Sequence, residues 1–328
     1  MMQLKNKINH LNKKILVSVI ITILIICILS SQVNSGDLLN LILSSNPYLI
    51  LMSFFCYSFS NFLRAYRFYI LLNKKCQLKV IIPITFVHNM VNSIFPARTG
   101  ELSYIFLMKK YSNERTGNTV ATLLASRMFD MLAICFLFFV SSYFVKDLPP
   151  FFSILIQIII FFCILLLFLS SIFFLKGDRV LSLIGKIFHL LKIENKNLIL
   201  KFFNISNDVN ASIKEFNSKK LIIYALSVSF CIWISNFFMV YFVLSGLQIF
   251  LSLPTVILGS TFMLLTTLLP IQGIAGFGTS EGLWTLVFVP LGMSTSTAIL
   301  SGFAYHIYYI LFYIILGIIG FMFILREK

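Results

Sequence analysis

Two short glycine-containing segments of this sequence end in or near a glutamate, inside stretches that are otherwise apolar. Their residues of interest are Pro96, Arg98, Gly100 and Glu101 in the first segment, and Gly276, Gly278, Thr279, Glu281 and Gly282 in the second. A glutamate is stabilised at the start of a helix, where backbone N–H groups lack partners and the helix dipole is positive. Glycine lets backbone N–H groups approach a ligand closely. Both segments are therefore candidate binding turns.

Arginine suits an anionic ligand, because its planar guanidinium binds phosphate through two parallel hydrogen bonds. We predict that Arg98 binds a phosphate, helped by Glu101. Arg127 lies three residues before Asp130, on one helix face, and can pair with Glu101 or Asp130 or supply a second cation. The alternative is a structural ion network, and for Arg127 and Asp130 both interpretations stay open.

Three further ionisable residues lie in apolar stretches. His306 fits either a polar contact between helices or a proton-linked group. Arg64 and Arg67 are expected to extend to a polar surface. Of the six cysteines, five lie in apolar runs and Cys76 lies in a basic segment, and no pair has metal-ligand spacing. We therefore predict no catalytic residues, no metal site and no cofactor.

The composition places these residues in a membrane. Of 328 residues, 59% are hydrophobic and 11% are charged, and the mean hydropathy is +0.96. A soluble domain has about 25% charged residues. The net charge of +15 then indicates contact with anionic lipid headgroups rather than with nucleic acid.

The apolar stretches predict an all-α polytopic membrane protein, because a spanning helix needs about 20 apolar residues. Six full spans are expected, at 15–33, 48–72, 119–145, 151–175, 221–247 and 297–325. Two shorter stretches, 80–108 and 253–291, are interrupted by Pro96 and Pro270. Since proline and glycine stop a helix at membrane depth, each is predicted to form a re-entrant hairpin of two half-helices.

The basic residues predict the orientation. With both termini inside and both hairpins returning to the side they entered from, Lys146 is the one residue among 26 Lys and Arg that falls outside. This bias indicates a multi-pass protein of the inner (cytoplasmic) membrane with both termini in the cytoplasm. The segment 176–220 is either a connecting loop or a pair of amphipathic surface helices at 180–192 and 196–217. The first apolar run is expected to be an anchor rather than a cleaved signal peptide.

An internal repeat organises the chain. Residues 55–66 and 230–241 are identical at six of twelve positions, at a constant offset of 175 that aligns Asn61 with Asn236. Each segment is followed by a broken stretch and a full span. We therefore expect one transmembrane domain over 1–328, divided into 1–47, repeat 1 at 48–145, a connection at 146–220 and repeat 2 at 221–328. Three crossings separate the units, which predicts an inverted-topology repeat with its site near the midplane.

The motifs resemble those of the lysylphosphatidylglycerol synthase transmembrane region, a flippase-like membrane family. The resemblance lies in PARTGELSYIFLMKK (96–110), ASRMFDMLAI (125–134) and GIAGFGTSEGLWTLVF (273–288). In the expected span 119–145 the family pattern Glu-Arg-x-x-Asp is met by Arg127 and Asp130, with Ser126 in place of the acid. Many members have an arginine in the last span where this chain has His306. This departure leaves open whether the second half of the chain supplies a cation to the site.

The resemblance implies a function in lipid transport. In full-length relatives the membrane region moves aminoacylated phosphatidylglycerol between leaflets, and a separate soluble domain transfers lysine. This sequence ends at Lys328, after the last span, so we expect translocation of an anionic phospholipid or lipid-linked intermediate and no transferase activity. The alternatives are a membrane-embedded transferase using Glu101 with Asp130, or an accessory subunit. The partners would be an envelope glycosyltransferase or an aminoacyl-lipid transferase.

Overall fold

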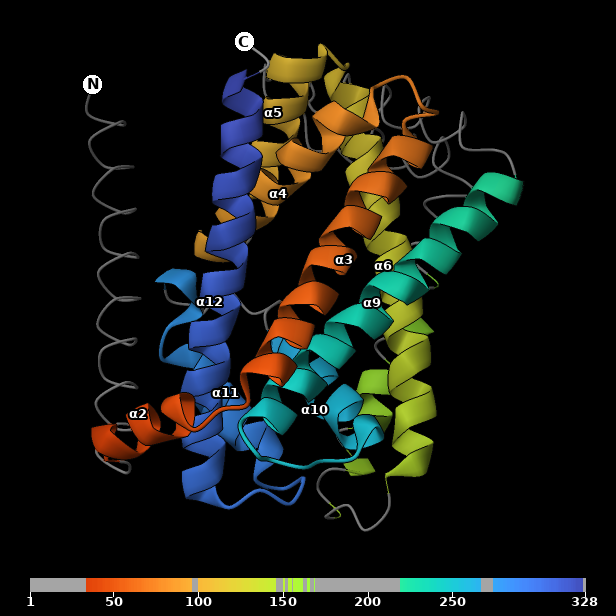
Figure 1. Cartoon of the computed structure of the whole chain (residues 1–328). Helices are drawn as coiled ribbons and strands as arrows, with labels where there is room; N and C mark the ends of the chain where they lie inside the picture. The colour runs from red at the N-terminus through yellow and green to blue at the C-terminus, as the bar shows by residue number, and fades with distance from the viewer. Residues whose placement is uncertain are drawn as a thin grey trace, which may run out of the picture.

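The computed structural model describes residues 34–95, 100–145, 219–266 and 274–326, together with isolated positions between 150 and 168. Every regular element in this described part is helical. The helices are α2 (Ser35–Leu43), α3 (Pro47–Leu71), α4 (Leu78–Ile94), α5 (Glu101–Ser112), α6 (Thr116–Phe144), α9 (Lys219–Gly246), α10 (Leu253–Thr266), η2 (Ile274–Gly276), α11 (Thr279–Phe288) and α12 (Thr295–Arg326) (Figure 1). The all-helical prediction is confirmed for these residues.

The long helices lie where the apolar stretches predict them, to within three residues at each end. Three of them, α6, α9 and α12, are long and apolar enough to cross a membrane. The pair α2 and α3, bent by 83°, makes a fourth candidate span if it is counted as one. The predicted span at 15–33, most of the span at 151–175, and the segment 176–220 except its last two residues lie outside the described residues.

The two broken stretches form pairs of shorter helices. Helices α4 and α5 have 17 and 12 residues, and α10 and α11 have 14 and 10. Each is shorter than the roughly 20 residues that cross a bilayer. The breaks at 96–99 and 267–273 lie outside the described residues, so Pro96, Arg98 and Pro270 are not placed.

Local sequence explains several helix ends. The side chain of Asn46 accepts hydrogen bonds from the backbone N–H groups of Tyr48 and Leu49, and Pro47 occupies the first turn of α3. Asn113 ends α5 in the left-handed conformation, at φ 55°. These caps fix where α3 begins and where the chain turns from α5 into α6.

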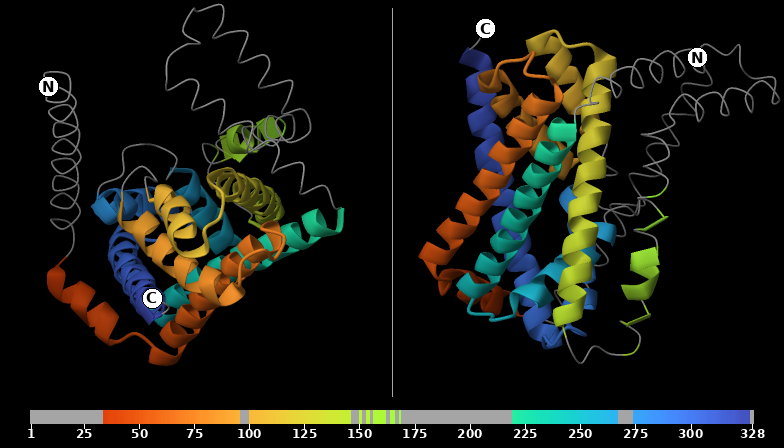
Figure 2. Two further views of the ribbon diagram at one scale, coloured as in Figure 1. Left: turned by 90° about the horizontal axis from the view of Figure 1, so that it is seen from above. Right: turned by 90° about the vertical axis from the view of Figure 1, so that its right-hand side faces the viewer.

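Helix packing joins elements that are far apart in the sequence. Helices α3 and α9 lie side by side and run in opposite directions (Figure 2). Helix α4 packs on α12, and α10 packs on α6. A Cβ atom on Gly320 of α12 would lie 2.8 Å from the carbonyl oxygen of Pro83, so glycine permits the close approach of α4.

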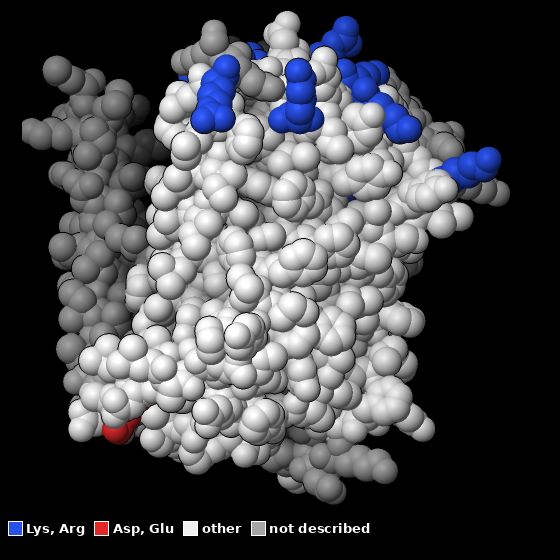
Figure 3. Space-filling model, viewed as in Figure 1, with Lys and Arg blue, Asp and Glu red and all other residues white. Residues whose placement is uncertain are grey.

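Charge is distributed unevenly between the two ends of the bundle. Lysine and arginine side chains gather at one end of the face drawn in Figure 3, and the rest of that face is uncharged over most of its height. This basic end includes Lys74 and Lys79, which follow α3, Lys109 and Lys110 in the last turn of α5, and Arg326 at the end of α12. The uncharged surface has the character of a surface in contact with lipid.

Candidate functional site

Glu101 opens α5, as its sequence context predicts. Gly100 precedes it and lies against α4, where an added Cβ would come within 2.7 Å of the backbone nitrogen of Asn92 and 2.8 Å of the carbonyl oxygen of Val91. Only glycine fits so close to another backbone. Gly100 therefore allows the first turn of α5, which includes Glu101, to lie directly against α4.

Arg127 of α6 pairs with Glu101. Its Nη2 atom lies 2.7 Å from Oε1 of Glu101, and the two side chains are 32% and 26% exposed. The Arg127 Nε atom is buried and has no partner among the described residues. Of the two pairings that the sequence left open for Arg127, the structure has the one with Glu101.

The turn before α11 has an unusual backbone. The φ angles of Ala275, Gly276 and Gly278 are 53°, 78° and 78°. Residues other than glycine rarely adopt this left-handed backbone region. The Thr279 hydroxyl donates to the carbonyl oxygen of Gly276 at 3.0 Å, and the Gly282 N–H continues the helix by donating to the carbonyl of Gly278. This turn places Glu281 in the first turn of α11, as predicted.

Glu281 pairs with His306 of α12 in a site closed to solvent. His306 Nδ1 lies 2.6 Å from Glu281 Oε1, and His306 Nε2 lies 2.9 Å from the carbonyl oxygen of Ala275. The Glu281 side chain is fully buried, and its Oε2 atom has no partner among the described residues. Phe277 covers the imidazole, with ring centroids 4.7 Å apart.

The hydrogen-bond pattern fixes the charge of this pair. A carbonyl oxygen can only accept, so Nε2 of His306 must carry a hydrogen and donate it to Ala275. The contact between Nδ1 and Glu281 Oε1 then contains one further proton, which belongs either to the carboxyl group or to the imidazole. In both cases the pair of Glu281 and His306 is neutral overall, which suits its burial.

Asp130 lies in a separate cluster with a different partner from the one expected. Its two carboxylate oxygens accept from Arg67 at 2.6 and 3.0 Å, and Trp233 Nε1 donates to it at 2.9 Å. Arg67 also donates to Ser229 at 2.5 Å. The expectation that Arg67 extends to a polar surface is wrong: it is 1% exposed, because burial with a bidentate carboxylate partner replaces its hydration.

Sequence reasoning missed Ser229 and Trp233 as members of this cluster. The available signal was periodicity, since both lie on one face of α9, four residues apart, and Arg67 lies on an apolar helix that also contains a second arginine. His306 has the position in the second pair that Arg127 has in the first, because each is the basic partner of a first-turn glutamate, 25 residues after Glu281 and 26 residues after Glu101.

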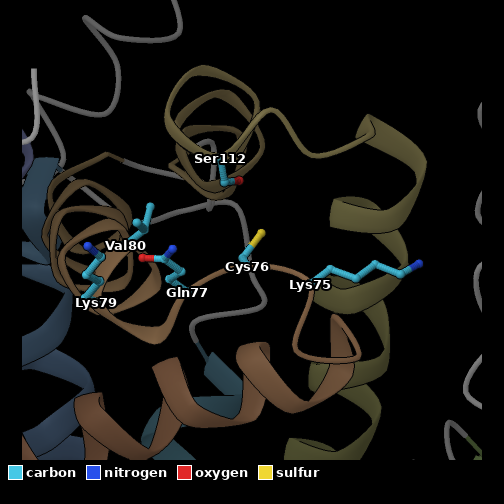
Figure 4. Close-up of a pocket in the computed structure, with 6 residues that line it drawn as sticks. All are labelled: Lys75, Cys76, Gln77, Lys79, Val80 and Ser112. Atoms are coloured by element: carbon cyan, nitrogen blue, oxygen red, sulfur yellow. The ribbon is translucent and has the colours of Figure 1, made fainter.

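A pocket of about 430 Å³ opens at the basic end of the bundle (Figure 4). Its lining comes from the α3–α4 connection, the start of α4 and the end of α5, and consists of Lys75, Cys76, Gln77, Lys79, Val80 and Ser112. The Cys76 thiol lies 3.3 Å from Oε1 of Glu114. Burial and the neighbouring Glu114 carboxylate raise the pKa of Cys76, so the thiol is held in its neutral form.

Known proteins similar to this chain are membrane proteins. The family model described as lysylphosphatidylglycerol synthase TM region matches residues 15–317. A UPF0104 membrane protein of Methanocaldococcus jannaschii is 28% identical over 204 residues, which are 61% of this chain and 78% of the relative. No solved structure matches the chain. The family match includes both glutamate pairs and the Asp130 cluster.

Proposed function

The chain belongs to the lysylphosphatidylglycerol synthase TM region family, and we propose from this membership and from its polar interior that it moves an anionic phospholipid or lipid-linked intermediate between the leaflets of the cytoplasmic membrane. The family is one of membrane proteins linked to lipid metabolism. Translocation needs a polar route for a headgroup through a protein whose outer surface is apolar. Ionisable residues at membrane depth are the usual markers of such a route.

The observation on which this proposal depends is a pair of matching ion contacts. Glu101 with Arg127, and Glu281 with His306, each join the first turn of a short helix to the next long helix. One pair is partly exposed and the other is closed to solvent. In an alternating transporter, equivalent sites in two halves are expected to differ in this way within any one state.

Helix contacts support an inverted repeat and two re-entrant hairpins as part of the proposal. If α3, α4 and α6 correspond to α9, α10 and α12, then the contact of α4 with α12 has its counterpart in that of α10 with α6. The start of α4 and the end of α5 line one pocket, so this pair of short helices enters and returns at the same end. In the second pair, Gly259 of α10 lies against Phe288 at the end of α11.

The basic end of the bundle is assigned to the cytoplasm in this proposal, following the preference of lysine and arginine for that side. The C-terminal end of α12 and the connection between α5 and α6 would then be cytoplasmic. The connection between α9 and α10 would face the opposite side. The pocket beside Lys79 would open among cytoplasmic headgroups.

An enzymatic function has weaker support. The acid–base pair that a transferase would need was Glu101 with Asp130, and both Asp130 oxygens are instead engaged by Arg67. The accessory-subunit alternative would use the basic segment 176–220, nearly all of which lies outside the described part of the chain. Neither alternative is favoured by a contact in the structure.

Leaflet exchange in reconstituted vesicles tests the proposal. Vesicles containing the purified chain and a fluorescent phosphatidylglycerol would be treated with a membrane-impermeant quencher, which reports the fraction of label in the outer leaflet. We expect exchange with the unmodified chain and at least about a tenfold slower rate with Glu281→Gln, because losing a charge-assisted hydrogen bond costs about 1.5–3 kcal/mol.

Glu114→Gln is the matched control, since it makes the same chemical change in the connection between α5 and α6. It should leave the rate of exchange unchanged. Absence of exchange with the unmodified chain, for phosphatidylglycerol and for a polyprenyl phosphate probe alike, would refute translocation.

A further inference from the structure

Among the described residues, Arg64 differs from Arg67 and Arg127 in forming no ion pair with an acid. Arg67 pairs with Asp130, and Arg127 pairs with Glu101. Among the described residues, none forms an ion pair or hydrogen bond with Arg64. Its guanidinium makes a cation–π contact with Trp233, in which the guanidinium carbon lies 5.6 Å from the ring centroid.

Arg64 lies on a line of polar contacts between α3 and α9. In order along α3 these contacts are Ser60 with Asn236 at 3.0 Å, Arg64 with Trp233, and Arg67 with Ser229 at 2.5 Å. The spacing of four and three residues on each helix keeps all six side chains on facing sides. Arg64 is thus held between two helices, although part of its surface remains accessible.

The charges around Arg64 do not balance. The Arg64 guanidinium interacts electrostatically with Arg67, Arg127 and Asp130. With Glu101, the described charges of this region are three guanidinium groups against two carboxylates, which leaves one positive charge in excess. A cation–π contact is worth about 0.5–2 kcal/mol, whereas removing an ion from water costs several kcal/mol. Trp233 alone therefore offsets only part of the cost of placing Arg64 here.

We propose that Arg64 binds the phosphodiester anion of a lipid headgroup, with Arg127 beside it. This inference rests on the proposed translocation and identifies the class of substrate at that site. A guanidinium suits phosphate because it offers two parallel N–H donors.

The excess of one positive charge among the described residues predicts which headgroups are favoured. A headgroup whose net charge is −1, such as phosphatidylglycerol, neutralises the region. A zwitterionic headgroup such as phosphatidylcholine brings its own cation and leaves the excess in place. Recognition by charge balance therefore predicts selectivity for monoanionic phosphodiester lipids over zwitterionic ones of the same chain length.

Trp233 provides a direct signal for binding at Arg64. The chain has two tryptophans, so Trp284→Phe leaves Trp233 as the one indole. A phosphate bound by Arg64 would draw the guanidinium away from the ring and change Trp233 emission. The experiment titrates phosphatidylglycerol, phosphatidylcholine with the same acyl chains, or inorganic phosphate into the Trp284→Phe protein in uncharged detergent and records emission.

The supporting result is a saturable change in emission with phosphatidylglycerol that phosphatidylcholine does not produce. In the Arg64→Gln protein, the half-saturating concentration of phosphatidylglycerol should rise about tenfold or more, equivalent to about 1.4 kcal/mol. Arg64→Lys should fall between, because it keeps the charge without the planar donor pair. Arg115→Gln, which removes an exposed arginine before α6, should titrate like the parent protein. Thermal unfolding of each variant checks that it is folded.

Equal titrations of the parent and Arg64→Gln proteins, or of phosphatidylglycerol and phosphatidylcholine, would overturn the inference. An equal response to inorganic phosphate would overturn its assignment to a lipid. These results are independent of transport. If the unmodified chain shows no leaflet exchange but binds phosphatidylglycerol through Arg64, translocation fails and the binding site stands; if exchange is normal in Arg64→Gln, the site fails and translocation stands.

Discussion

Ser60 of α3 and Asn236 of α9 are hydrogen-bonded to each other, with 3.0 Å between Ser60 Oγ and Asn236 Oδ1. They belong to the two segments that match in sequence, in which Ser60-Asn61 aligns with Ser235-Asn236. Ser60 and Asn236 lie one position apart in this alignment, and such near-equivalent residues on antiparallel helices meet only near a two-fold axis. The contact therefore favours such an axis between α3 and α9, as the proposed inverted repeat requires.

Cross-linking can test this packing. In a chain without its native cysteines, the pair Ser60→Cys and Asn236→Cys should form a disulfide under mild oxidation, because both side chains lie in the interface. Phe59→Cys with Asn236→Cys is the control, since Phe59 is 46% exposed on another face of α3. Equal yields for the two pairs, measured by gel mobility before and after reduction, would contradict the α3–α9 contact.

The proposed orientation predicts which loops an impermeant reagent reaches. Gln248→Cys, between α9 and α10, should react with a charged maleimide in intact spheroplasts. Asn113→Cys, between α5 and α6 at the basic end, should react only after permeabilisation. Both residues are exposed, so accessibility of the side chain does not differ. The reverse labelling pattern would place the basic end outside and reject the assignment.

The two arginine–carboxylate pairs should differ in what they contribute. Asp130→Asn leaves Arg67 buried without a charge partner, and we expect a loss of about 3–5 kcal/mol in unfolding free energy. Glu101→Gln breaks a partly exposed pair and should cost about 1 kcal/mol or less, while slowing leaflet exchange. Thermal or denaturant unfolding in detergent, alongside the exchange assay, measures both. Similar stability losses for the two variants would remove the distinction between a structural pair and a functional one.

Glycine at the α4–α12 contact should be needed for packing. Gly320→Leu places side-chain atoms where Pro83 and Phe86 already lie within 2.8 Å of the first added carbon. We expect the helices to separate at a cost of about 1–3 kcal/mol, with a lower unfolding temperature. Gly36→Ala is the control, because its added carbon would meet only Asn34, at 3.5 Å. An unchanged unfolding temperature for Gly320→Leu would show that α4 and α12 are not in close contact.

The thiol of Cys76 should react slowly with alkylating agents. Burial and Glu114 raise its pKa, and the reactive form is the thiolate. With the other cysteines replaced, the alkylation rate should rise as the pH increases. Glu114→Gln removes a negative charge that raises this pKa, so it should increase the rate severalfold at neutral pH. A rate that Glu114→Gln leaves unchanged would mean that the carboxylate does not contact Cys76.

The sequence determined the helices and the position of the key acids within them. Runs of apolar residues are visible without any partner, so α3, α6, α9 and α12 begin and end close to where the pattern places them. Glu101 and Glu281 could be assigned to first turns, because the glycines before them and the interruption of the apolar stretch are local features. These properties depend on neighbours in the chain and on the solvent.

The tertiary structure decided which charges meet. Periodicity places Arg127 and Asp130 on one helix face, but it does not say which neighbouring helix each residue faces. Arg127 faces α5 and pairs with Glu101, whereas Asp130 faces α3 and α9 and pairs with Arg67. That Arg64 forms no ion pair with a described residue follows from the same packing. An ion pair joins residues distant in sequence, so it is fixed only when the helices are assembled.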